Sequence, residues 1–289
     1  MGANAKMTLY TLVYSHYFCR MFRKNALIIL LLSSVLMLTG CSEYQRVLKS
    51  TDLDYKYTKA VEYYEEGQYN KALPIFKELR ELYRGTVKVQ DVYYYYCATL
   101  FGIEDYILAG YHFKFFYQTF PSHPRANEAA YMTAKCYYLE APKWSLDQAY
   151  TYKAVNELQL YINTHPGSSY IPECNDMIDE LRGKLEKKSY EIAYQYYHTR
   201  QYRAALTAFA NTLNDFPDTP YREEAMFYRM RSAFLLAENS VLDKQADRFK
   251  AARTAYLDFV RTFPDSEFKD DADETMTKIE EYLNGKSVS

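Results

Sequence analysis

The spacing between alanine and proline constrains the fold of this chain more than any other feature. In four segments a proline follows an alanine by twelve residues, and large apolar side chains lie between them. Proline has no backbone N–H and disfavours helical geometry in the preceding residue, so each proline predicts the end of a helix. The small alanine predicts the point where a second helix crosses closely. The four pairs are Ala109 and Pro121, Ala154 and Pro166, Ala205 and Pro217, and Ala252 and Pro264.

A fifth unit precedes these four and indicates which repeat they represent. Residues 57–83 carry small and aromatic side chains at the offsets of the tetratricopeptide repeat, although Arg84 stands where the terminal proline would be. The matching residues are Gly67, Tyr69, Ala72, Phe76 and Leu79. We therefore predict an all-α fold: a tetratricopeptide-repeat solenoid of five helical hairpins plus a C-terminal capping helix over about Lys269 to Leu283.

The repeats are longer than usual. Successive alanines are 37, 45, 51 and 47 residues apart, against about 34 in the standard repeat. The extra length predicts inserted loops at 141–146 and 238–243 and an unusually long first helix over 170–198.

The N-terminal segment has the pattern of a lipoprotein signal. Three basic residues precede the apolar run 26–38, which ends in Leu38-Thr39-Gly40-Cys41. The run is shorter than the ~20 residues of a membrane-spanning helix, and the pattern resembles bacterial signals in which the cysteine is lipidated and becomes the mature N-terminus. An ordinary secretory signal with a chance cysteine is the alternative. Acyl chains such as palmitate on Cys41 would hold the protein at a membrane.

These patterns divide the chain into four parts. Residues 1–40 are the predicted signal peptide, of which 1–20 could be an over-called start because Met21 begins a conventional signal. Residues 41–50 form a lipidated tether, 51–167 hold repeats 1–3, and 168–289 hold repeats 4–5 with the capping helix.

Composition and motifs argue against several function classes. The net charge of −2 lacks the basic excess of a nucleic-acid-binding protein. No nucleophile elbow, phosphate-binding loop or zinc motif is present, so we predict neither an enzyme nor a cofactor or metal. Cys97, Cys136 and Cys174 fall within helical patterns and are predicted to be buried thiols rather than disulfide partners.

Tyrosine is the residue from which we predict a binding surface. The chain has 33 Tyr and only 1 Trp, and aromatic side chains recur on the first helix of every hairpin, at positions equivalent to Tyr57, Val61 and Tyr64. First helices line the concave face of such solenoids, so we expect this aromatic row to line a groove. A tyrosine hydroxyl suits a partly wet protein-binding surface. Packing between neighbouring hairpins is the alternative for each residue.

A lipobox followed by five enlarged hairpins, with Phe-Pro-x-x-Pro turns such as 120–124 and 216–220, resembles the BamD family of outer-membrane assembly lipoproteins. The resemblance covers nearly all of the chain after Cys41. It implies a lipid-anchored scaffold on the outer membrane that faces the periplasm. The implied partners are a BamA-like barrel insertase, other assembly-machinery lipoproteins and unfolded outer-membrane proteins.

The resemblance also divides the aromatic row between two roles. The N-terminal part would form a groove for substrate peptides, and the C-terminal part would dock the insertase. Candidate groove residues are Tyr57, Tyr64, Tyr94, Phe101, Tyr131 and Tyr138. Candidate docking residues are Tyr190, Tyr194, Tyr197, Phe227, Arg231 and Phe234.

Two other function classes compete with this interpretation. A glycan-binding helical-repeat lipoprotein of a nutrient-uptake system would also use aromatics, but such proteins are longer and rich in tryptophan, whereas this chain has only Trp144. A cell-wall hydrolase would need a catalytic constellation that the sequence does not show.

Overall fold

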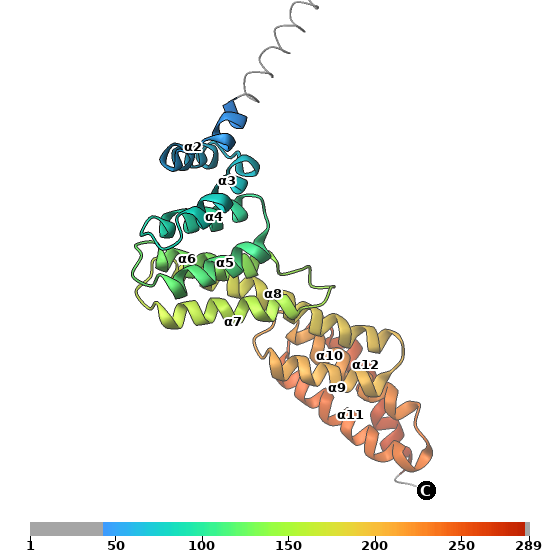
Figure 1. Cartoon of the computed structure of the whole chain (residues 1–289). Coiled ribbons are helices and arrows are strands. Elements are labelled where there is room, and N and C mark those ends of the chain that lie inside the picture. Colours follow the sequence, from blue (N-terminus) through green and yellow to red (C-terminus); the bar gives the residue numbers. More distant parts are fainter. Residues whose placement is uncertain (1–42, 287–289) are drawn as a thin grey trace, which may run out of the picture. The chain divides into compact units, whose positions relative to one another are not determined.

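The computed structural model describes residues 43–286 (Figure 1). Within that range every regular element is a helix and no strand occurs, so the predicted all-α class is confirmed. Residues 43–49 are helical. They are followed by α2 (Leu53–Glu65), α3 (Tyr69–Leu82), α4 (Val89–Gly102), α5 (Tyr106–Thr119), α6 (Ala126–Leu139), α7 (Ala149–Thr164), α8 (Ile171–His198), α9 (Tyr202–Asp215), α10 (Arg222–Glu238), α11 (Leu242–Thr262) and α12 (Lys269–Lys286).

The predicted signal peptide and Cys41 lie outside the described residues. None of the described helices is both long and apolar enough to span a bilayer.

The chain divides into two compact units between Asp105 and Tyr106, and each is described by itself. In the first unit, α2, α3 and α4 pack on one another. In the second unit, each helix from α5 to α12 packs on the next one, as in a tetratricopeptide-like solenoid, and α12 also contacts α10. The predicted boundary between repeats 1–3 and repeats 4–5, at 167/168, lies in the connection between α7 and α8 and stays a prediction.

The alanine–proline spacing sets the helix ends as predicted. The helices α5, α7, α9 and α11 each end two residues before their proline. The alanine of each unit is fully buried, which is consistent with a close helix crossing at that point. These alanines are Ala72, Ala109, Ala154, Ala205 and Ala252.

The extra length of the repeats lies partly where we predicted it. Residues 140–148 connect α6 and α7, which agrees with the loop predicted at 141–146, and α8 is 28 residues long as expected for 170–198. The loop predicted at 238–243 is wrong, because only 239–241 separate α10 from α11. The additional residues lengthen those two helices to 17 and 21 residues instead.

Candidate binding surfaces

The first position of the aromatic row is covered by the turn that leads into the next repeat. In three repeats of the second unit, the residue four places after the proline stacks on this ring. The stacked pairs are Tyr131 with Tyr170 at 4.1 Å between ring centroids, Tyr190 with Tyr221 at 4.8 Å, and Phe227 with Phe268 at 4.6 Å. Such contacts contribute about 0.5–1.5 kcal/mol beyond apolar burial. This position therefore joins consecutive repeats.

The same turns are shaped by a hydroxyl two residues after each proline. The Ser168 Oγ accepts a hydrogen bond from the backbone N–H of Tyr170 at 3.2 Å, and the Ser266 Oγ accepts one from Phe268 at 3.0 Å. Thr219 makes the equivalent contact to Tyr221 at 3.4 Å. Since these short side chains favour tight turns, they place the stacking ring directly before the next helix begins.

The middle and last positions of the row also contact the next first helix. Lys135 on α6 pairs with Glu173 on α8 at 3.0 Å. The Tyr138 hydroxyl donates to Glu180 of α8, and this hydrogen bond is the main cause that raises the pKa of Tyr138 to about 12. Lys184 pairs with the same glutamate at 3.1 Å. Polar contacts thus tie α6 to α8 along the row.

In the last repeat the capping helix covers the row. Arg231 donates to the hydroxyl of Thr275 on α12 at 2.9 Å. Phe227 packs with Ala272, and Phe234 packs in a cluster with Ile279. The predicted docking residues of α10 therefore contact α12, which lies where the first helix of a sixth repeat would be.

The first unit has its own aromatic cluster, centred on a residue that sequence reasoning missed. The half-buried Tyr95 stacks on Phe76 at 5.5 Å and makes edge contacts with Tyr64 at 5.4 Å and Tyr57 at 6.2 Å. The Lys88 ammonium lies 4.8 Å from the centroid of Tyr57 and replaces the stacked ring of later repeats. Four consecutive tyrosines at 93–96 look alike in the sequence, so the pattern could not distinguish Tyr95 from the other three, which are buried.

Burial separates the candidates into two groups. Five are buried: Tyr94, Tyr131, Tyr190, Phe227 and Phe234. Seven keep part of their surface accessible: Tyr57, Tyr64, Phe101, Tyr138, Tyr194, Tyr197 and Arg231. The packing alternative accounts for the buried group. A binding role stays a prediction, and it rests on the accessible group.

An open groove of about 1150 Å³ lies elsewhere on the second unit, between the α8–α9 turn and the C-terminal end of α10. Its apolar walls include Ile192, Leu235 and Leu236. Arg200 and Arg203 border it, and within the described residues neither makes an ion pair. The groove offers apolar contact together with two unpaired positive charges, which suits a peptide that carries both apolar and acidic groups.

The buried cysteines are poorly placed for reactivity. Burial is the main cause that raises the pKa of Cys136 to about 12 and that of Cys174 to about 11, so both remain protonated thiols near neutral pH. Among residues 43–286, no group of three or more His, Cys, Asp and Glu side chains is arranged to hold a metal ion.

Comparison with known proteins places the chain in a family. The profile of the YfiO family, described as outer membrane lipoprotein, matches residues 50–247. The outer membrane protein assembly factor BamD of Caulobacter vibrioides is 24% identical over 198 residues, covering 65% of this chain. The match spans 62% of the length of that relative. Since the family profile covers more than half of the chain, this protein belongs to the YfiO family of outer membrane lipoproteins.

Proposed function

We propose that this protein is a non-enzymatic scaffold of the outer-membrane barrel-assembly machinery, anchored by lipid on Cys41 and facing the periplasm. It would bind the barrel insertase, associate with other lipoproteins of the machinery, and receive unfolded outer-membrane proteins. The observation that carries the proposal is the family match over residues 50–247, together with similarity to a protein named as an outer membrane protein assembly factor.

The described architecture supports a binding role. A helical-repeat solenoid presents an extended surface, and its accessible aromatics and the groove at Arg200 and Arg203 offer contacts to extended peptides. Unfolded outer-membrane proteins contain alternating apolar and polar residues, so a surface that combines apolar walls with unpaired charge suits them. The family match favours this function over glycan uptake.

Depletion of the protein, followed by quantification of outer-membrane proteins, tests the proposal. We expect integral barrel proteins to fall while other lipoproteins stay constant, because only barrels require the insertase. A tagged copy should also retain the barrel insertase when it is purified from gently solubilised envelopes. Unchanged barrel levels after complete depletion would contradict the assembly role.

The anchor is tested separately with Cys41→Ser. We expect this variant to lose incorporation of radiolabelled palmitate and to leave the membrane fraction, since a single substitution removes every acyl chain. Ser42→Ala is the matched control and should remain labelled. Labelling of the Cys41→Ser variant would contradict the predicted lipidation site.

A further inference from the structure

The connection between α6 and α7, residues 140–148, is held together by its own hydrogen bonds. At its end lies the buried Gln148, whose amide nitrogen donates to three carbonyl oxygens of the loop. These are the oxygens of Lys143, Trp144 and Leu146, at 2.9, 3.3 and 2.8 Å. The amide oxygen accepts from the Thr151 hydroxyl at 2.8 Å. One side chain therefore links three backbone carbonyl groups of the loop.

The loop is also fastened to α8. Lys188 donates to the carbonyl oxygen of Leu146, and the Lys187 ammonium lies 4.8 Å from the centre of the Trp144 ring. The solenoid does not require this arrangement, because residues 66–68 and 199–201 suffice to connect the helices of other hairpins. The rigid loop positions the only tryptophan of the chain against α8.

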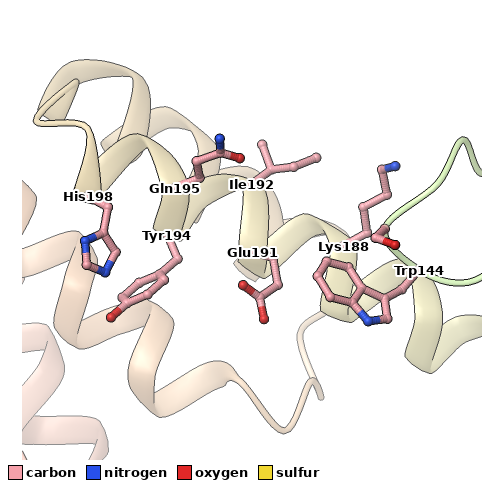
Figure 2. A pocket seen from close by; sticks show the side chains of 8 residues that line it. Trp144, Lys188, Glu191, Ile192, Tyr194, Gln195 and His198 are labelled. Atoms are coloured by element: carbon pink, nitrogen blue, oxygen red, sulfur yellow. The ribbon is translucent and has the colours of Figure 1, made fainter.

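A pocket of about 540 Å³ lies between this loop and α8 (Figure 2). Trp144 stands at one end and Tyr194 with His198 at the other, and the Glu191 carboxylate lies between them (Figure 2). Gln195 also lines the pocket. Within the described residues, neither the Trp144 indole N–H nor the side chains of Glu191 and Gln195 make a hydrogen bond, so their polar atoms are available to a ligand.

The chemistry of the lining indicates the class of ligand. Lys188 and Glu191 have opposite charges, so the pocket favours neither a strongly anionic nor a strongly cationic molecule. A sugar ring has an apolar face of C–H groups and an edge of hydroxyls. An aromatic ring covers the first, and carboxylate and amide side chains bind the second. We propose that this pocket binds a neutral saccharide, with Trp144 against the ring face and Glu191 and Gln195 bound to the hydroxyls.

The hydrogen bonds that already hold the loop lower the conformational entropy that binding would cost. This inference is independent of the assembly function, since the pocket could bind a glycan whether or not the solenoid handles barrel proteins. Two kinds of neutral saccharide have such an apolar ring face and hydroxyl edge: the N-acetylated strands of the cell wall and neutral hexose polymers.

Intrinsic fluorescence tests the proposal directly, because Trp144 is the only tryptophan in the full chain. The full chain, in a detergent without a sugar headgroup, is titrated with tri-N-acetylchitotriose and with maltotriose up to about 10 mM. We expect a saturable change in tryptophan emission with at least one sugar. A response to chitotriose alone assigns N-acetylated strands, and a response to maltotriose assigns neutral hexose polymers.

Glu191→Gln should weaken the binding about tenfold, because a charge-assisted hydrogen bond to the sugar becomes a neutral one that is about half as strong. Asp179→Asn, an exposed change on the same helix, should bind like the unaltered protein. Thermal melting followed by circular dichroism confirms that both variants fold. The proposal is overturned if neither sugar gives a saturable change, or if the folded Glu191→Gln variant binds with unaltered affinity.

Discussion

Three turns between consecutive helices share one backbone conformation. Gly67, Glu104 and Arg200 have φ values of 72°, 65° and 60°, and each lies five residues before the alanine of the second helix. The next residue then donates its backbone N–H back to the first helix, as in the bond from Gln201 to the Tyr196 carbonyl at 2.9 Å. This is a common way to end a helix, and glycine is its usual residue.

Arg200→Gly should therefore stabilise the fold. A residue with a Cβ in the left-handed region costs about 1–2 kcal/mol. Glycine also increases the conformational entropy of the unfolded chain, which offsets about 0.5–1 kcal/mol of the gain. Arg200 is exposed, and within residues 43–286 it has no ion pair to lose. We expect a net increase of about 0.5–1 kcal/mol in the free energy of unfolding, measured by urea denaturation.

Gly67→Ala provides the opposite control. Apart from the residue itself and its two chain neighbours, nothing lies within 4 Å of the position of the new Cβ, so any loss of stability comes from the backbone conformation rather than from a clash. It should destabilise the protein by about 1 kcal/mol. A less stable Arg200→Gly variant would contradict this explanation of the turn.

At the scale of helices, Glu173 is one of two carboxylates of α8 that bind side chains of α6, the other being Glu180. The Tyr131 hydroxyl and the Lys135 ammonium both bond to Glu173, and these two hydrogen bonds hold the pKa of Glu173 below its ordinary value of 4.5. The bond to this carboxylate also adds to the burial that raises the pKa of Tyr131. The charged form of Glu173 therefore joins two consecutive first helices.

This contact should make stability depend on pH. Because the folded pKa of Glu173 is lower than the unfolded one, its contribution is fully present above the ordinary pKa of 4.5 and is lost as pH falls through the folded value. Glu173→Gln should lower Tm at neutral pH and flatten its decline below about pH 4.5. Asp176→Asn on the same helix should leave the profile unchanged, whereas identical profiles for both variants would disprove the role of Glu173.

The limits of sequence reasoning are visible in the same helices. The spacing of alanine and proline correctly located the helix ends, because proline acts locally on the backbone. The period of the aromatic row showed which side chains share a helix face, but not what covers that face. The row therefore predicts Tyr131 in a substrate groove and Phe227 on a docking surface, whereas Tyr170 and Phe268 stack on these two rings. Repeat length likewise cannot distinguish a loop at 238–243 from two longer helices.

For the binding surfaces, local patterns gave still less information. Trp144 and the loop at 141–146 were both visible in the sequence, but the contact of that loop with α8 joins residues about 40 positions apart. Arg200 and Arg203 likewise line one groove with Leu235 and Leu236, which lie more than 30 positions away in the sequence. Such surfaces depend on how successive repeats pack, which periodicity within one repeat does not contain.

At the scale of the whole molecule, a repeat protein must close its last repeat. The helix α12 does so here by packing on α10 and α11, and Ile279 is fully buried in the cluster that contains Phe234 and Phe249. Repeat units that lack such a cap expose an apolar face and lose solubility. The capping helix therefore contributes to the stability of the solenoid as well as to its shape at the end.

Ile279→Ala tests this contribution. Removing a large buried aliphatic side chain typically costs about 2–5 kcal/mol, because the neighbouring rings cannot fully close the cavity. We expect such a loss in thermal and urea unfolding, with faster proteolysis of α10 and α12. Lys278→Ala, at an exposed position beside it, should change stability by no more than about 0.5 kcal/mol. If the two variants had the same free energy of unfolding, α12 would not stabilise the solenoid, and the face of α10 that carries Arg231 would be available for docking.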